Sequence, residues 1–119
     1  HRQLGAGDIL FEEGDVGDAM YVVVSGELGV EVGDNGSTRQ IATLVAPDFV
    51  GEMALIDKRP RAARVRATSD AVLLAISHAN IYSFARVHRS GFTWLVVNIA
   101  KNLASRLRAM NDAASGVAE

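Results

Sequence analysis

Short apolar runs and turn residues alternate over the first 77 residues of the chain. Residues 20–24 and 71–76 are β-branched, aromatic or aliphatic, which favours strands. Residues 27–32 alternate polar and apolar side chains, a pattern typical of a strand with one face in a core. Asn35-Gly36 separates that run from the next one and indicates a hairpin turn. About seven or eight short strands at this close spacing predict an antiparallel β-sandwich or roll.

From Ser77 onward the apolar spacing changes from that of strands to that of helices. Ser77 is expected to cap the N-terminus of a first helix, and Ser90-Gly91 is expected to end it. A longer helix is expected from about Thr93 to Asn111, because one apolar stripe recurs there at offsets of three and four residues. The stripe consists of Leu95, Val96, Ile99, Leu103, Leu107 and Met110.

This order of strands and then helices predicts an α+β fold. We expect an antiparallel β-roll, a jelly-roll-like double-stranded β-helix, followed by C-terminal helices. The roll is expected over residues 1–77, the helices over 78–111 and a short polar tail over 112–119. Because 119 residues suffice for one core and not for two, the chain is expected to be a single domain.

Composition narrows the possible partners. The net charge of -2 argues against a basic, nucleic-acid-binding face, and no apolar run approaches the ~20 residues of a membrane span. The chain has no cysteine, and its three histidines lack metal-ligand spacing. We therefore expect a cytoplasmic chain with no metal, no membrane insertion and no nucleic-acid binding of its own. Since the first residue is His1 and not Met, we also expect an effector domain outside the chain.

The motifs of common enzyme classes are missing from the sequence. It has no Gly-x-Ser-x-Gly nucleophile motif, no phosphate loop that ends in Gly-Lys-Ser/Thr and no Gly-x-Gly-x-x-Gly. The acidic residues of the segment 12–18 do not have the spacing of a calcium loop and indicate a structural turn. The sequence therefore predicts a binding domain and not an enzyme.

The stretch from Phe49 to Arg66 concentrates groups that suit a small anion. A glycine before Glu52 allows close approach of the backbone, and the carboxylate can accept a hydrogen bond from a hydroxyl. Arg61 offers a fork of donors for phosphate oxygens, and the N–H groups of Ala62 and Ala63 are unobstructed. These groups suit a ligand with one phosphate, one hydroxyl and an apolar body. The alternative for Glu52 and Arg61 alone is a structural salt bridge.

Two segments of this stretch resemble the phosphate-binding cassette of cyclic nucleotide-binding domains, such as those of catabolite activator protein and of protein kinase A regulatory subunits. They are Phe49-Val50-Gly51-Glu52-Met53-Ala54-Leu55 and Pro60-Arg61-Ala62-Ala63-x-Val65. The glycine-rich run from Gly7 to Gly26 resembles the first strands of that family, and Leu103 to Leu107 resembles its last helix. The resemblance covers nearly the entire chain.

The resemblance implies a cyclic nucleotide ligand and a role for each matched position. Gly51 and Glu52 would hold the ribose 2′-hydroxyl. Arg61 and the N–H groups of Ala62 and Ala63 would hold the cyclic phosphate. Packing on the cassette and the base is implied for Val50, Met53, Ala54, Leu107, Met110 and Asn111.

The position after the arginine bears on the choice of base. Family members that prefer cGMP often carry a threonine there, whereas this chain has Ala62, so cAMP is expected over cGMP. The chain also departs from the family's pattern at two places. Ala46-Pro47-Asp48 stands where Pro-Gly-Asp is usual, and Arg64 stands where a threonine is frequent. Arg64 is expected either to bring a further cation near the phosphate or to face solvent.

These patterns predict an allosteric, cAMP-binding regulatory domain in signal transduction. Two alternatives stay open: a ligand-independent dimerisation or interaction module with the same fold, and a cGMP-preferring sensor. The apolar stripe of the last helix suits a homodimer interface as well as a lid over the ligand. Only residues 112–119 follow that helix, which leaves no room for a helix-turn-helix and predicts no DNA binding by this chain.

Overall fold

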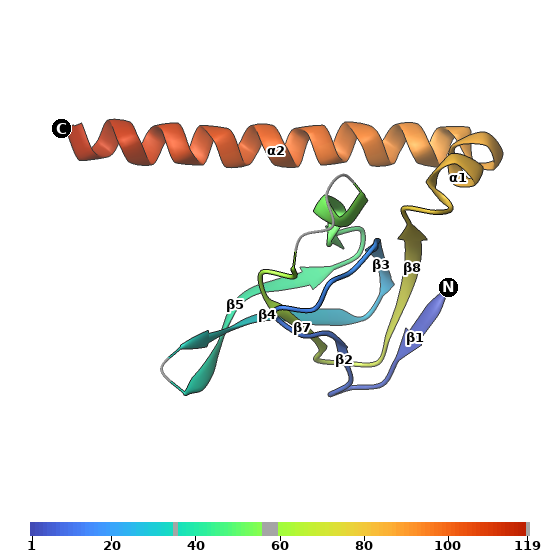
Figure 1. Ribbon diagram of the computed structural model, residues 1–119, viewed down its shortest axis with the longest axis horizontal. Coiled ribbons are helices and arrows are strands. Elements are labelled where there is room, and N and C mark those ends of the chain that lie inside the picture. Colours follow the sequence, from blue (N-terminus) through green and yellow to red (C-terminus); the bar gives the residue numbers. More distant parts are fainter. Residues whose placement is uncertain (35, 56–59, 119) are drawn as a thin grey trace. The chain divides into compact units, whose positions relative to one another are not determined.

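The computed structural model describes residues 1–34, 36–55 and 60–118, without the side chains of residue 34 and residues 110–118 (Figure 1). The chain divides into two compact units, His1–Ile81 and Tyr82–Glu119. The strands within the described ranges are β1 (Arg2–Leu4), β2 (Ile9–Phe11), β3 (Ala19–Ser25), β4 (Glu27–Asp34), β5 (Ser37–Val45), β6 (Phe49–Val50), β7 (Arg64–Ala67) and β8 (Ala71–Ser77). The helices are the 3-10 helix η1 (Glu52–Leu55) and the α-helices α1 (Ile81–Val87) and α2 (Arg89–Ala118).

Two four-stranded antiparallel sheets form the first unit (Figure 1). One sheet has the strand order β1-β8-β3-β6 and the other has the order β2-β7-β4-β5. The predicted β-roll followed by helices is thereby confirmed. The short strand β1 was not predicted, because a three-residue strand with one buried side chain shows no periodicity. Its position depends on pairing with residues about 70 positions away, where Arg2 lies opposite Leu73.

The core of the roll consists of side chains that the two sheets turn toward each other. Strand β7 shows the alternation most clearly, because Val65 and Ala67 are fully buried while Arg64 and Arg66 are only partly covered. Each buried Val or Leu contributes about 1.5–3 kcal/mol relative to an exposed one. The buried members of the cluster are Leu4, Leu10, Val23, Leu28, Val65, Ala67, Ala71 and Leu73.

Strands β4 and β5 form the longest hairpin, which extends well beyond the other strands (Figure 1). Their register runs from Glu27 opposite Val45 to Asp34 opposite Ser37, which agrees with the predicted hairpin. Of the predicted turn residues, Gly36 has a φ of 86°, and Asn35 lies outside the described residues.

Ser77, the predicted N-cap, is the last residue of β8 and lies four residues before Ile81, where α1 begins. Its hydroxyl accepts a hydrogen bond from the Asn80 amide, and the Asn80 side chain accepts one from the Ser77 amide, at 3.2 and 2.7 Å. This reciprocal pair closes a turn between the strand and α1, which begins at Ile81. The pair has the reciprocal pattern of a capping box, on the turn that leads directly into α1.

The predicted helix break at Ser90-Gly91 is wrong, because both residues lie in the first turn of α2. The interruption falls at His88 alone, and the His88 carbonyl accepts a hydrogen bond from the Phe92 amide at 2.8 Å. A Cβ at Gly91 would lie 3.6 Å from the ring of Phe84, whose centroid is 6.4 Å from that of Phe92. The glycine thus lies where α1 and α2 pack closely, and a glycine near a helix start is readily tolerated.

Helix α2 is longer than the predicted span at both ends, from Arg89 to Ala118. Residues expected to form a polar tail continue the helix, and three of the residues from 112 to 118 are alanine, the strongest helix former. No helix in the described part of the chain combines the length and the hydropathy needed to cross a bilayer.

Candidate functional site

The first half of the cassette is a sharp passage from β6 into η1. Strand β6 pairs with β3, with Val50 opposite Tyr21. Gly51 then takes a φ of 81°, and its carbonyl accepts a hydrogen bond from the Ala54 amide at 3.0 Å. An L-residue with a side chain adopts this φ only at a cost, so a glycine is required between the strand and the 3-10 helix. The turn delivers Glu52 as the first residue of η1.

Glu52 is the one charged residue that is buried among those that the structure describes, with an exposed fraction of 5%. Burying a carboxylate is costly unless it has polar partners. Because Glu52 directly follows Gly51, the turn places this buried carboxylate at the beginning of η1. Ala54, two residues later, is also buried, whereas the side chain of Met53 is 38% exposed.

The second half of the cassette is tied to the acidic turn 12–18. The Arg61 amide donates to the carbonyl of Asp15 at 2.7 Å, and the Arg61 carbonyl accepts from the Gly14 amide at 2.8 Å. Val16 and Pro60 form an isolated β-bridge beside this pair. The turn therefore holds the cassette through its main chain. In the described ranges, no group of three or more His, Cys, Asp or Glu residues is arranged to hold a metal ion.

The guanidinium group of Arg61 lies in a closely fitted slot. Its Nη2 donates to the Ala19 carbonyl at 2.8 Å, and its Nη1 lies 3.5 Å from the Gly51 carbonyl oxygen. The ring of Phe11 lies against the guanidinium, with 4.2 Å between Cζ and the ring centroid. Cation–π contacts of this kind are worth about 0.5–2 kcal/mol, depending on desolvation. The cation is thus positioned by backbone oxygens and an aromatic face.

Two glycines create the space for this slot. A Cβ on Gly51 would lie 2.6 Å from Nη1 of Arg61, and a Cβ on Gly17 would overlap the same guanidinium group. The Nε of Arg61 is buried and has no hydrogen-bond partner in the described part of the chain. A buried donor without a partner is unfavourable, and a ligand oxygen that reached it would remove that cost.

Arg64 contacts two acids, Glu12 and Glu31. Its Nε donates to Oε1 of Glu12 at 2.6 Å, and its Nη1 lies 3.6 Å from Oε1 of Glu31. The hydrogen bond to Glu12 and the negative charge of that carboxylate raise the pKa of Arg64 above its usual value. The side chain of Arg64 keeps 28% of its surface exposed, so it lies at the surface of the sheet beside these two acids. The sequence could not indicate the Glu12 contact, because the two residues are 52 positions apart.

The structure brings Gly51, Glu52 and Arg61 together at one place on the roll, with Ala62 exposed and Ala63 half-buried directly after Arg61. Val50 packs against the core cluster. Leu107 belongs to α2 in the second unit and is 61% exposed. The side chains of Met110 and Asn111 lie outside the described part. The sequence-based prediction did not include Phe11, Gly17 and Ala19 among the residues that position Arg61. The sequence did offer a signal for two of them, because Phe11 and Gly17 both lie in the glycine-rich run from Gly7 to Gly26.

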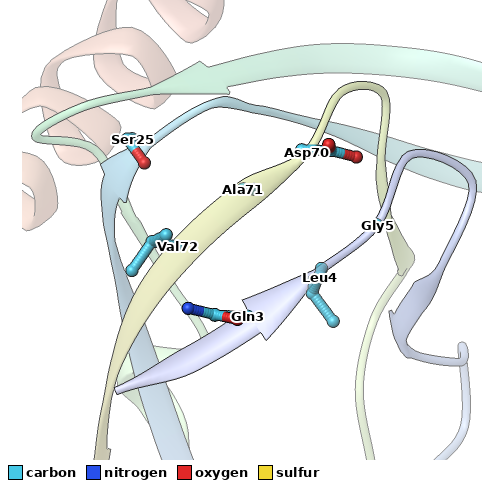
Figure 2. A pocket seen from close by; sticks show the side chains of 7 residues that line it. All are labelled: Gln3, Leu4, Gly5, Ser25, Asp70, Ala71 and Val72. Carbon is cyan, nitrogen blue, oxygen red and sulfur yellow. The ribbon is translucent and has the colours of Figure 1, made fainter.

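A separate open groove of about 500 Å³ is lined by residues of β1, the end of β3 and the start of β8 (Figure 2). None of the residues predicted to bind a ligand lines it. The carboxylate of Asp70 accepts a hydrogen bond from the Ala6 amide at 3.0 Å, so this acid closes the turn after β1. The lining residues are Gln3, Leu4, Gly5, Ser25, Asp70, Ala71 and Val72.

Comparison with known proteins agrees with this geometry. The family model described as "Cyclic nucleotide-binding domain" matches residues 1–88. A cAMP-dependent protein kinase regulatory subunit of Blastocladiella emersonii is 36% identical over 90 residues, which are 75% of this chain and 22% of that protein. The chain thus spans less than a quarter of the length of that relative.

Solved structures give the same result. The catabolite activator protein of Thermus thermophilus matches with a TM-score of 0.77 and 32% identity, over 92% of this chain and 50% of that one. The cAMP-bound form of the EAL enzyme Bd1971 matches with a TM-score of 0.64 and 27% identity, over 89% and 29% of the two chains. Its cGMP-bound form matches with a TM-score of 0.64 and 26% identity, over 86% and 27%. The chain therefore belongs to the family of cyclic nucleotide-binding domains.

Proposed function

We propose that the chain binds cAMP at the cassette and acts as a regulatory domain of a larger protein. One observation carries this proposal: the guanidinium of Arg61 is held within 3.5 Å of the Gly51 carbonyl, next to the buried carboxylate of Glu52. A cation and an acid on adjacent backbone segments match a ligand that has a phosphate close to a hydroxyl. The ribose of a cyclic nucleotide has this arrangement.

Each residue has a separate task in the proposed complex. Glu52 accepts a hydrogen bond from the ribose 2′-hydroxyl, and Gly51 allows the sugar to approach the backbone. Arg61 contacts the cyclic phosphate, and the amides of Ala62 and Ala63 donate to its oxygens. A guanidinium provides charge and geometry together, so its loss is expected to reduce affinity strongly.

The choice of cAMP over cGMP depends on Ala62. An alanine side chain offers no hydroxyl to a guanine, and one missing hydrogen bond is worth on the order of 1 kcal/mol, or about fivefold in affinity. The relative Bd1971 has both cAMP-bound and cGMP-bound forms, so relatives alone do not select the base.

Isothermal titration calorimetry tests the proposal directly. Wild type is expected to bind cAMP more tightly than cGMP, and Arg61→Ala is expected to lose most of the affinity for both. Arg39→Ala is the matched control, because Arg39 is an exposed arginine on β5 that should not affect binding. Equal binding of cAMP by wild type and Arg61→Ala would refute the role of the arginine, and absence of binding by wild type would refute the function.

A ligand-independent dimer is the second candidate function. Val96, Val97 and Leu107 on α2 expose 44–61% of their surface. Sedimentation velocity with and without cAMP separates the candidates. A dimer of unchanged mass that binds no cAMP supports the second candidate, whereas binding of cAMP supports the first whatever the oligomeric state. In a regulatory domain the coupling of ligand to output is typically about 1–3 kcal/mol.

A further inference from the structure

Two adjacent residues at the end of β2 contact the two arginines of the segment 61–64. The ring of Phe11 lies against the guanidinium of Arg61, with 4.2 Å from Cζ to the ring centroid. The carboxylate of the next residue, Glu12, accepts the hydrogen bond from Nε of Arg64 at 2.6 Å. The main chain adds a third connection, since the Arg61 amide donates to Asp15. The segment 61–64 is therefore attached to the segment 11–15 at its first residue, Arg61, and at its last residue, Arg64.

Arg64 is bracketed by one acid directly after β2 and one acid on β4 of the same sheet. Glu12 follows β2, and Glu31 lies opposite Arg64 in the pairing of β4 with β7. The side chain of Arg64 is only 28% exposed, compared with 45% for Glu12. Oε1 of Glu31 is also 3.6 Å from Nη1 of Arg64 and from Nε of Arg66. The charge of Arg64 is thus paired with acids of this sheet.

We propose that Arg64 is a positioning residue whose ion pairs with Glu12 and Glu31 hold the segment 61–64 on β2 and β4, and so fix Arg61 for the ligand. The effect on the ligand rests on the proposed cAMP binding. The effect on the main chain does not, because the hydrogen bond from the Arg61 amide to Asp15 exists without a ligand. Arg64 therefore acts through Arg61 and does not contact the phosphate.

The direction in which one substitution changes the affinity for cAMP separates this role from direct phosphate binding. Glu12→Gln keeps the shape of the side chain but removes its charge. If Arg64 positions Arg61, Glu12→Gln weakens cAMP binding, by about threefold to fivefold on the usual scale of a partly exposed ion pair. If Arg64 instead binds the phosphate, Glu12→Gln releases its charge and strengthens binding. Arg64→Gln weakens binding in both cases, so that variant alone is not decisive.

The experiment uses calorimetry with cAMP on wild type, Glu12→Gln, Arg64→Gln, the double variant and Arg39→Gln as matched control. Arg39 is an exposed arginine on β5, whereas Arg66 would be unsuitable because it shares Oε1 of Glu31 with Arg64. We expect the double variant to bind no more weakly than Arg64→Gln, because the two substitutions remove the same contact. Arg39→Gln should keep the wild-type affinity. Tighter binding by Glu12→Gln, or additive losses in the double variant, would overturn the proposal.

Amide hydrogen exchange provides a test that needs no ligand. In Arg64→Gln and Glu12→Gln the Arg61 amide should exchange several times faster, while the amides of β8 in the other sheet keep their wild-type rates. A general loss of stability would accelerate both groups together. Unchanged exchange of the Arg61 amide overturns the positioning role. If wild type binds no cAMP, the proposed function fails, and the exchange rates still decide whether Arg64 positions the segment.

Discussion

Gly17 is the place where the chain leaves room for Arg61, and its substitution by alanine tests the geometry of the slot. A Cβ on Gly17 overlaps the guanidinium, and its three nearest atoms all belong to the Arg61 side chain. Gly17 is not among the glycines with positive φ, so alanine suits its backbone. Gly17→Ala is therefore expected to perturb the protein through Arg61.

The magnitude follows from the contacts that the guanidinium must give up. A hydrogen bond from a charged donor, here to Ala19, is worth about 1.5–3 kcal/mol, and the contact with Phe11 adds about 0.5–1 kcal/mol. Alanine in place of glycine returns about 0.4–1 kcal/mol, because it restricts the unfolded chain. The net loss in free energy of unfolding is about 1–3.5 kcal/mol. In an Arg61→Ala background the obstacle is absent, so Gly17→Ala should stabilise by about 0.4–1 kcal/mol.

Urea unfolding of wild type, the two single variants and the double variant gives the coupling between the two positions. The expected result is a change of sign: Gly17→Ala destabilises the protein when Arg61 is present and stabilises it when Arg61 is absent. Gly33→Ala is a suitable control, because a Cβ there meets no atom within 4 Å and its effect should be equal in both backgrounds. The reasoning is refuted if Gly17→Ala has the same effect with and without Arg61.

Three further substitutions test other parts of the structure. Gly51→Ala puts a side chain at a φ of 81° and against Arg61, so urea unfolding should show a loss of about 1–3 kcal/mol. Phe11→Leu keeps an apolar side chain but removes the ring that contacts Arg61. Calorimetry should show weaker cAMP binding, while the far-ultraviolet circular dichroism spectrum, which reports secondary structure, is unchanged. Gly91→Ala places a methyl group at ordinary contact distance from Phe84, so thermal melting should show a gain of about 0.5–1 kcal/mol. A loss of stability in Gly91→Ala would instead support the predicted helix break at Ser90-Gly91.

The sequence was sufficient for elements whose periodicity lies within one segment. The alternation of β4 and the apolar run of β8 predicted their strands, and the offsets of three and four predicted most of α2. It failed at helix ends, where a glycine was interpreted as a break although the neighbouring helix made it a packing position. Turn residues carry local preferences, but tertiary contacts such as that of Phe84 with Phe92 decide how a glycine is used.

The site shows the same division between local and distant information. Gly51 and Glu52 are adjacent, and their chemistry was visible in the motif. The support of Arg61 comes from Phe11, Gly17 and Ala19, which are more than 40 positions earlier. They enter the site because β2 pairs with β7 and β3 pairs with β6. Composition and spacing cannot reveal such partners, because the pairing of sheets sets them.

The acidic turn 12–18 contributes to the site in two distinct ways. Together they determine which arginine can offer its positive charge to a ligand. The main chain of Asp15 and Gly14 fixes Arg61 without neutralising it, whereas the carboxylate of Glu12 neutralises Arg64. Of these two arginines, Arg61 alone offers its charge and a buried, unpaired Nε to a ligand. A cyclic phosphodiester carries one negative charge, while a phosphate monoester carries about 1.5 to 2 at neutral pH. Under the proposed positioning role of Arg64, this single available cation suits the cyclic nucleotide better than its hydrolysed 5′-monophosphate, which carries the larger negative charge.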